Sequence, residues 1–180
     1  TIGGSLAVGW SGPMTWQYWS PRDVTIGMKV VQADGTVTKS GGQVVKNVSG
    51  YDMARMHIGA IGTLGIIVEV SLKLTPLPSQ QSTALVEFDS DRDCLNAALA
   101  VFQSSLVPLA ITTLHTRAAQ TPFHWDTAKG PLLAVRIGGR AKAVQRQIDD
   151  VVALCHGHNS SNIDVLDESS AASMWRGFSD

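Results

Sequence analysis

Glycine is concentrated in the first third of this chain, and this limits how that part can fold. Twelve of the 17 glycines fall within the first 65 of 180 residues. Two stretches are especially dense, TIGGSLAVGWSGP at residues 1–13 and GAIGTLGIIVEVSLKL at residues 59–74. Glycine is favoured where φ is positive or where another group must approach the backbone closely. The pattern therefore indicates either tight turns in an irregular sheet or a backbone surface against which a ligand lies.

The glycine-dense part ends at the sequence TPLP, residues 75–78. Two prolines so close together end a strand and favour an extended connection. We therefore expect a domain boundary here, with one domain in residues 1–78 and a second, incomplete one in residues 79–180.

The first domain is predicted to contain strands and little helix. Residues 24–31 form one expected strand, and Asp34-Gly35 after it is typical of a hairpin turn. A short helix is expected over residues 50–56, with Met53 and Met56 on one face. A half-buried strand follows in which alternate apolar residues share one face; they are Val68, Val70, Leu72 and Leu74.

The second domain shows a regular alternation of strands and helices. Asp89 or Ser90 can cap the first helix, whose apolar residues recur at helical spacing; they are Leu95, Leu99 and Phe102. A second helix over residues 140–154 is predicted to bury Val144, Ile148, Val151 and Val152. The expected strands are residues 84–88, 111–115, 132–137 and 163–166. This βαββαβ order is that of a ferredoxin-like unit, so the fold class is α+β.

Composition and charge exclude several classes of function. A formal net charge of −1 leaves no excess of Lys and Arg to neutralise nucleic-acid phosphates. No run of about 18 apolar residues is present, so we expect no transmembrane segment. The start of the chain lacks the pattern of a secretory signal. Cys94 and Cys155 form no pairing motif, which favours a reducing compartment, and we predict a cytoplasmic location.

Familiar catalytic and phosphate-binding motifs are absent. In GWSGP, residues 9–13, proline stands where a hydrolase nucleophile elbow needs its last glycine, so Ser11 is no nucleophile. Neither G-x-G-x-x-G between a strand and a helix nor the P-loop motif occurs. His156 and His158 lie at a predicted helix end without a second cluster, and no metal site is expected. What remains is exposed backbone beside small side chains, which suits a flat, partly anionic ligand.

Specific residues carry a resemblance to a known family. They are Thr1-Ile-Gly-Gly4, Ser11-Gly-Pro13, Pro21-Arg-Asp23, the segment from Gly41 to Met53, and Gly62-Thr-Leu-Gly-Ile-Ile-Val-Glu69. They resemble the FAD-binding PCMH-type domain of the vanillyl-alcohol oxidase superfamily, and most of all the GlcE-like flavin subunits of the glycolate oxidase group. The resemblance implies the C-terminal subdomain of such a flavin domain, followed by a ferredoxin-like cap, in a piece truncated at both ends.

The same resemblance implies FAD as cofactor and assigns contacts to it. Backbone at Thr1, Gly3 and Gly4 would approach the ribityl and pyrophosphate region, and Ala7 and Ser11 would lie beside the cofactor. The remaining contacts would come from the second glycine stretch, with the Ile67 main chain toward the adenine; they are Gly65, Ile66 and Ile67. Arg22 and Asp23 are expected to pair locally. No catalytic base is identified.

The implied activity is oxidation of a 2-hydroxy acid such as glycolate. Electrons would pass to partners, a second flavin subunit or an iron–sulfur subunit, and any association with a membrane would run through those partners. Two alternatives stay open: a non-catalytic scaffold subunit, and an independent ferredoxin-like binding module in residues 80–180. The aromatic stretch of Trp10, Trp16, Tyr18 and Trp19 fits either a flavin pocket or a subunit contact.

Overall fold

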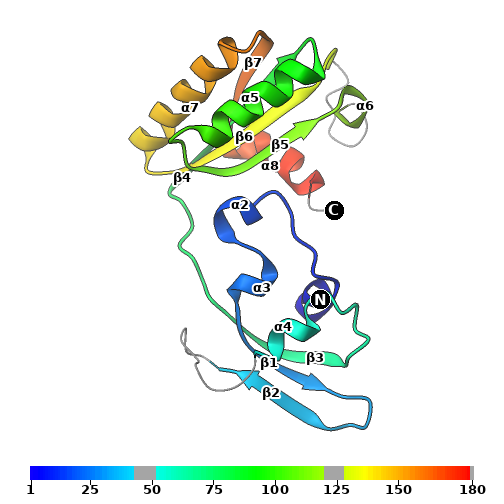
Figure 1. Ribbon diagram of the computed structural model, residues 1–180. Helices are drawn as coiled ribbons and strands as arrows, with labels where there is room; N and C mark the ends of the chain where they lie inside the picture. The colour runs from blue at the N-terminus through cyan, green and yellow to red at the C-terminus, as the bar shows by residue number, and fades with distance from the viewer. Residues whose placement is uncertain (43–51, 120–127, 179–180) are drawn as a thin grey trace. The chain divides into compact units, whose positions relative to one another are not determined.

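The computed structural model describes residues 1–42, 52–119 and 128–178 (Figure 1). The chain divides into two compact units, Thr1–Pro76 and Leu77–Asp180. Helices and antiparallel sheets occur in both, so the fold class is α+β, as predicted. The division falls inside the proline-containing stretch at residues 75–78, where Leu77 is 88% exposed.

The first unit is built on a three-stranded antiparallel sheet in the order β2-β1-β3. Its strands are β1 (Thr25–Val31), β2 (Val37–Gly41) and β3 (Ile66–Leu72). The predicted hairpin between β1 and β2 is present, because Gly35 has a φ of 84° and the Thr36 N–H donates to Asp34 Oδ1 at 2.9 Å. The described helices of this unit are α1 (Ile2–Val8), α2 (Thr15–Tyr18), α3 (Pro21–Val24) and α4 (Ala54–His57).

A small core joins α1 and α4 to one face of this sheet. Leu6 of α1 and Ala54 of α4 are buried with Met28 and Val30 of β1, each no more than 6% exposed. The α4 helix is shorter than the predicted helix over residues 50–56, of which Gly50 and Tyr51 lie outside the described part of the chain.

The predicted face of β3 is wrong. Val68 and Leu72 are exposed, and Leu74 lies beyond the strand's end at 87% exposure, while Ile67 and Val70 pack on the core. The cause is a bulge in the pairing with β1, between the pairs Lys29–Glu69 and Val30–Ile67. A bulge inserts one extra residue, so two side chains separated by three positions face the same side.

The second unit has a four-stranded antiparallel sheet in the order β5-β6-β4-β7. In sequence the elements run strand, helix, two strands, helix, strand, in the predicted order, with two further helices. They are β4 (Gln80–Phe88), α5 (Asp91–Gln103), β5 (Pro108–Leu114), α6 (Thr116–Ala119), β6 (Leu132–Gly139), α7 (Ala141–His156), β7 (Ser160–Asp167) and α8 (Glu168–Gly177).

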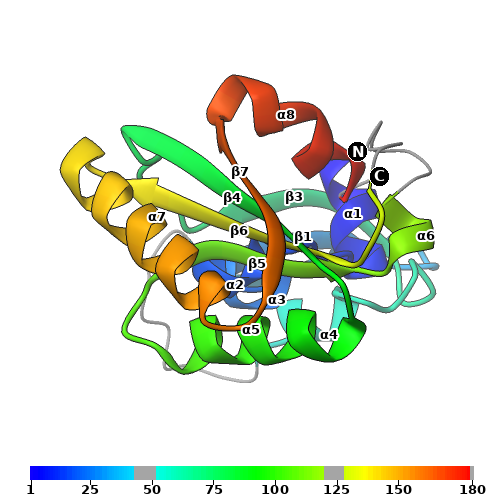
Figure 2. The same ribbon diagram turned by 90° about the horizontal axis from the view of Figure 1, so that it is seen from above.

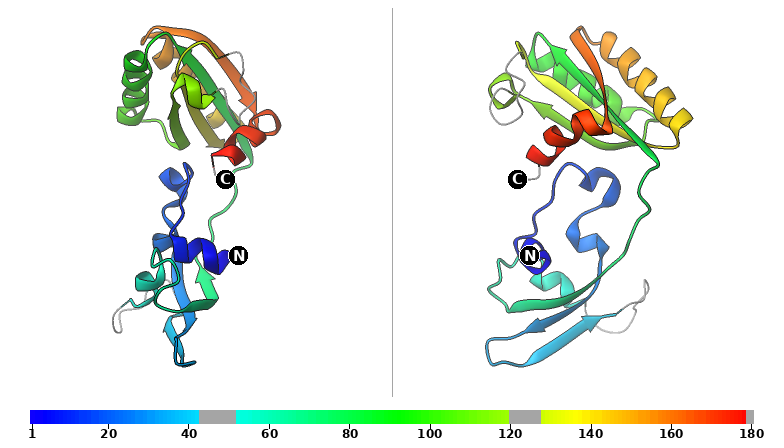
Figure 3. Two further views of the ribbon diagram at one scale, coloured as in Figure 1. Left: turned by 90° about the vertical axis from the view of Figure 1, so that its right-hand side faces the viewer. Right: turned by 180° about the vertical axis from the view of Figure 1, so that it is seen from behind.

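Two long helices cover one face of this sheet, and α8 lies on the other (Figures 2 and 3). Val144, Ile148 and Val151 of α7 are at most 2% exposed, as predicted, and pack with Val86 and Val135 of the sheet. On the opposite face, Trp175 of α8 donates its Nε1–H to Thr83 Oγ1 at 2.9 Å. The α8 helix therefore packs on this sheet through Trp175.

The α5 helix begins at a predicted cap but does not bury its most obvious apolar residues. Ser90 Oγ accepts from the Asp93 N–H at 3.1 Å. Leu95, Leu99 and Phe102 are each more than half exposed, whereas Cys94, Ala97 and Val101 fill the core. Small residues face the sheet because α5 and α7 share the available width over it.

No helix in the three described ranges is both long and apolar enough to cross a membrane.

Candidate flavin-binding surface

The first glycine stretch is helical, which the sequence did not predict. Thr1 caps α1, with its Oγ1 accepting the Gly4 N–H at 3.1 Å. The helix ends at Gly9, whose φ of 72° lies in the left-handed region. Two glycines inside a short helix are unfavourable by about 1 kcal/mol each relative to alanine. Their presence therefore needs a reason in the surroundings of α1.

The two glycine stretches lie directly against one another. The Gly59 N–H donates to the Leu6 carbonyl at 3.1 Å, and the Ile61 N–H donates to the Ala7 carbonyl at 2.8 Å. Further along α1, Gly3 lies over Ile67 of β3, close enough that a Cβ would stand 2.9 Å from the Ile67 carbonyl oxygen. Residues 1–9 and 59–67 thus form one continuous seam, which we call the α1–β3 seam.

Close contact within the chain accounts for two further glycines of the seam. A Cβ on Gly9 would stand 3.0 Å from the Gly59 Cα. At Gly65 φ is 143°, and a Cβ would stand 2.7 Å from Val30 Cγ1 and 2.8 Å from the Val31 carbonyl oxygen. A Cβ at Gly65 would come closer than real Cβ atoms do, and one at Gly9 would be unusually tight, so glycine stands at these positions, as at Gly3, because other parts of the chain fill the space.

Gly4 differs from Gly3, Gly9 and Gly65. The atom nearest to a Cβ placed there is Oγ1 of its own capping residue, Thr1, at 3.1 Å, and the residue is exposed. Packing of the chain therefore does not require a glycine at this position. Gly4 is the place where the bare backbone of α1 is open to a ligand.

The structure brings seven of the eight predicted flavin contacts onto the α1–β3 seam. Thr1, Gly4 and Ile66 are exposed there, and the others are half-buried, namely Gly3, Ala7, Gly65 and Ile67. Ser11 is exposed and follows the end of α1, where Trp10 N–H still donates to the Ser5 carbonyl at 3.3 Å. Flavin contact at each of the eight stays a prediction.

The seam has the features that a dinucleotide phosphate needs. The first N–H groups of a helix have no partner within the helix and carry partial positive charge. The first turn of α1 contains no acidic residue, so no carboxylate there repels an anion. Anions bind at such helix ends in many proteins. The start of α1 is therefore compatible with an anionic group such as a phosphate, and contact of Thr1, Gly3 and Gly4 with the FAD phosphates stays a prediction.

Arg22 and Asp23 have structural partners. Arg22 Nη2 donates to the Ile58 carbonyl at 3.3 Å, which ties α3 to the end of α4. Asp23 forms a capping box with Ser20, whose Oγ lies 2.6 Å from Asp23 Oδ2. The side-chain and backbone hydrogen bonds from Ser20 lower the pKa of the Asp23 carboxyl. Asp23 thus pairs locally, as expected, whereas Arg22 bonds to main chain 36 residues away.

The segment from Gly41 to Met53, which carries part of the family resemblance, is described only in part. Within it, Lys46, Asn47 and Tyr51 lie outside the described residues. Asp52 Oδ2 pairs with Arg55 Nε at 2.8 Å, at the start of α4. Within the described part of the chain, no three His, Cys, Asp or Glu side chains are grouped so that they could hold a metal ion.

The tryptophans of the first unit are exposed. Trp10, Trp16 and Trp19 are 60, 45 and 52% exposed. Lys73 Nζ lies 4.7 Å from the centroid of the Trp19 ring, a cation–π distance. Exposed tryptophans in such number are typical of surfaces that other proteins or ligands cover.

Comparison with known proteins shows relatives over nearly the whole chain. Glycolate oxidase subunit GlcD of Bacillus subtilis (strain 168) is 28% identical over 160 residues, which is 86% of this chain and 34% of that protein. The mitochondrial D-lactate dehydrogenase [cytochrome] of Arabidopsis thaliana is 29% identical over 180 residues, covering 98% and 32%. Glycolate oxidase subunit GlcE of Escherichia coli (strain K12) is 40% identical over 78 residues, covering 43% and 22%.

The fold is also found among solved structures. An alkyldihydroxyacetonephosphate synthase superposes with a TM-score of 0.70 over 96% of this chain and 35% of its own, at 18% identity. No family model matches the chain. The chain spans about a third of the length of the longer relatives.

The structural comparison shows that the chain shares its α+β fold with the alkyldihydroxyacetonephosphate synthase. In sequence the chain is similar to glycolate oxidase subunits and D-lactate dehydrogenases, in keeping with the resemblance that its residues carry.

Proposed function

We propose that the chain is part of an FAD-dependent oxidoreductase that oxidises a 2-hydroxy acid such as glycolate. Residues 1–78 belong to its flavin domain, and residues 79–180 form a ferredoxin-like cap over the substrate. The observation that carries the proposal is the α1–β3 seam, where two separated glycine stretches join beside the exposed backbone of Gly4. The names of the relatives, which are a glycolate oxidase subunit and a D-lactate dehydrogenase, supply the substrate class.

FAD would supply the chemistry by accepting the hydride from the α-carbon of the hydroxy acid. The seam's part is to bind and orient that cofactor. The N–H groups at the start of α1 hold its phosphates, and Gly4 lets the cofactor lie against main chain. Ile66 and Ile67, at the start of β3, exclude water from its side. We assign no catalytic base to this chain.

The protein works as one subunit of a complex. A second flavin subunit and an iron–sulfur subunit are the proposed partners that take the electrons, and relatives named as the GlcD and GlcE subunits of glycolate oxidase support this. The exposed Trp10, Trp16 and Trp19 offer a contact surface. We place the complex in the cytoplasm, in keeping with two free, buried cysteines.

The direct test is to purify the complete polypeptide with the proteins that copurify with it and record the visible spectrum. We expect a flavin band, bleached anaerobically by glycolate, D-lactate or D-2-hydroxyglutarate, with one acid acting at the lowest concentration. A protein that shows no flavin band and releases no FAD on denaturation would refute the proposal. A flavin band that none of the three acids bleaches would refute the substrate class alone.

The exposed tryptophans also favour a second function, that of a scaffold subunit whose fold holds a catalytic partner. In that case the complex would assemble and turn over with FAD on the partner and none on this chain. Counting FAD per complex after denaturation, against the number of flavin subunits, separates the two functions.

A further inference from the structure

Trp19 holds a backbone conformation that tryptophan rarely adopts. Its φ is 62° and its ψ is 177°. This combination lies in a region of φ and ψ that is populated almost entirely by glycine, because a Cβ there collides with neighbouring backbone atoms. Keeping any other residue in this region is unfavourable for folding. The presence of tryptophan therefore needs a reason beyond its own backbone.

The neighbouring helices fix this conformation from both sides. Trp19 is the single residue between Tyr18, the last of α2, and Ser20, the N-cap of α3. Its N–H donates to the Thr15 carbonyl at 3.0 Å, at the end of α2. The Ser20 N–H donates to Asp23 Oδ2 at 3.2 Å within the capping box of α3. The two helices thus leave one residue for the turn between them, and glycine would make that turn without strain.

Packing in the core does not explain why the side chain of Trp19 is kept. The residue is 52% exposed and is not a member of the buried cluster that joins α1 and α4 to the sheet. Lys73 Nζ lies over its ring at 4.7 Å from the centroid, and Lys73 is itself exposed. A cation–π contact stabilises little when both groups are in water. A tryptophan that is both strained and exposed is better explained by a contact outside this unit than by the fold.

The surface around the ring combines aromatic and cationic groups. Residues 10–20 contain three tryptophans and no charged side chain. The Lys73 N–H donates to the Val24 carbonyl at 2.8 Å, which fixes the backbone from which the ammonium group reaches the Trp19 ring. The next acidic residue in sequence, Asp23, accepts from Ser20 Oγ at 2.6 Å. The surface at Trp19 therefore presents an indole ring beside an ammonium group.

We propose that Trp19 is the anchor residue of an interface with a partner subunit, whose surface receives the indole in a recess and places a carboxylate near Lys73. The inference rests on the proposed role of the chain as one subunit of a complex. Tryptophan is among the residues that contribute most to binding when a partner covers them. Because the strained backbone holds Trp19 in one orientation before binding, less conformational freedom is lost on association.

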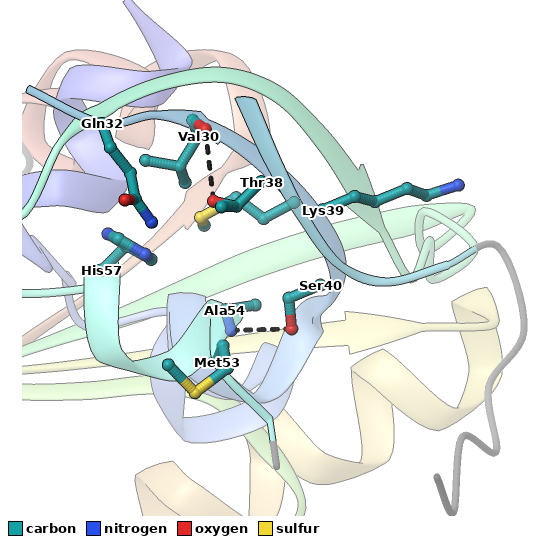
Figure 4. Close-up of a pocket in the computed structure, with 9 residues that line it drawn as sticks. Val30, Gln32, Thr38, Lys39, Ser40, Met53, Ala54 and His57 are labelled. Atoms are coloured by element: carbon teal, nitrogen blue, oxygen red, sulfur yellow. Dashed lines mark hydrogen bonds between the residues drawn. The ribbon is translucent and has the colours of Figure 1, made fainter. Parts of the chain in front are cut away.

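Binding is measured by biolayer interferometry between the complete polypeptide and the subunit that copurifies with it, after the two are separated and recombined. Trp19→Gly and Trp19→Ala should each weaken binding by roughly tenfold or more, since both lack the ring. Lys73→Glu should weaken it by roughly three- to tenfold, with a smaller effect at high salt. Lys39→Glu is the matched control and should bind as wild type, because Lys39 is an exposed lysine of β2 that extends away from the side chains around it (Figure 4).

A stability measurement separates this role from a structural one. Alanine keeps a Cβ in the strained conformation, whereas glycine does not. In urea unfolding followed by circular dichroism, the equilibrium constant for unfolding should be roughly tenfold lower for Trp19→Gly than for Trp19→Ala. Trp10 is the matched control, since it is 60% exposed and its φ is not positive. There the order should reverse, with Trp10→Gly less stable than Trp10→Ala.

Three results would overturn the proposal. They are the absence of any copurifying subunit, wild-type affinity for that subunit in Trp19→Gly or Lys73→Glu, and lower stability of Trp19→Gly than of Trp19→Ala. If the Trp19 variants fail to fold, hydroxyl-radical footprinting of the wild type decides the matter, because oxidation of Trp19 must fall when the complex forms. A protein that shows a flavin band bleached by a hydroxy acid, yet keeps its partner affinity in Trp19→Gly, would refute this inference alone and not the proposed activity.

Discussion

Gly3, Gly9 and Gly65 each lie against another segment of main chain, whereas Gly4 faces solvent. The distinction matters because the two kinds of glycine fail in different ways when substituted. A side chain at a packed glycine pushes two backbone segments apart and destabilises the fold. A side chain at Gly4 meets the flexible end of Thr1 and whatever ligand lies there.

Gly65→Ala tests a glycine that is packed against another segment of the chain. Its φ of 143° and the two contacts below 3 Å predict a loss of roughly 2–3 kcal/mol in the free energy of unfolding of the first unit. Urea unfolding followed by tryptophan fluorescence measures it. Gly42→Ala is the control, because no atom of the described residues lies within 4 Å of its added Cβ; it should stay within about 0.5 kcal/mol of wild type. Equal stability of the two variants would show that Gly65 is not packed as described.

The glycine residues illustrate what could be predicted from sequence at this scale. Their clustering indicated close backbone approach, and the structure shows such approach at Gly3, Gly9 and Gly65. What the clustering could not indicate is that the approaching group is the protein's own β3 or β1 in these cases. A packed glycine and a ligand-facing glycine look alike until the partner segment is known.

Among the elements, β3 and α5 show why apolar spacing alone misplaces a face. In β3 the period of two is broken by the bulge beside Val68, so alternate residues leave the core face partway along the strand. In α5 the larger apolar residues Leu95, Leu99 and Phe102 form a stripe that is solvent-exposed. Size and spacing indicate an apolar face, but only the packing of α5 beside α7 decides that the smaller residues turn inward.

One substitution on each face of α5 should affect the free energy of unfolding differently. Leu99→Gln should change the free energy of unfolding of the second unit by no more than about 0.5 kcal/mol, because Leu99 is 54% exposed. Val101→Ala should cost roughly 2 kcal/mol, because Val101 is 1% exposed in the core. Thermal or urea unfolding of both variants measures the difference. A larger cost for Leu99→Gln than for Val101→Ala would reverse the assignment of faces.

The burial of Cys94 in α5 and Cys155 in α7 predicts that the free energy of unfolding falls at alkaline pH. Burial raises the pKa of the Cys94 thiol to about 11 and that of Cys155 to about 12, and nearby Asp91 and Cys94 respectively add to the two shifts. Because the unfolded thiols ionise near pH 9, the folded state holds more protons above that pH. The stabilisation is complete below pH 9 and is lost as pH rises toward 11–12.

The measurement is urea unfolding between pH 8 and pH 11, in wild type and in Cys94→Ala/Cys155→Ala. The free energy of unfolding should fall more steeply with pH in wild type than in the double variant, which lacks both thiols but keeps every lysine and tyrosine. A thiol reagent should modify neither cysteine at pH 8 until the protein unfolds. Parallel pH slopes, or rapid modification of the folded protein, would contradict the burial of these thiols.

For the whole molecule, long periodic segments were predictable and short ones were not. The βαββαβ order of the second unit followed from helical and alternating patterns that extend over many residues, and tertiary packing reinforced them. The helices α1, α2 and α3 have four to seven residues, with glycine in α1 and proline at the start of α3. Such helices exist because of their caps and contacts, as at Thr1 and Ser20, and not because of their intrinsic propensity.

The candidate site was likewise predictable from sequence only in part. The family resemblance named seven residues that the structure gathers on one seam, although they come from segments about 60 residues apart in sequence.

The measurement that tests the central claim most directly is the FAD affinity of Gly4→Leu in the complete protein, with Gly42→Leu as control. Both variants add the same side chain to the first unit, one on the α1–β3 seam and one at the end of β2. After removal and re-addition of FAD, we predict that Gly4→Leu loses at least tenfold in affinity while its circular dichroism spectrum and unfolding midpoint stay close to those of Gly42→Leu. Wild-type FAD affinity in a folded Gly4→Leu protein would contradict the claim that the cofactor lies against this backbone.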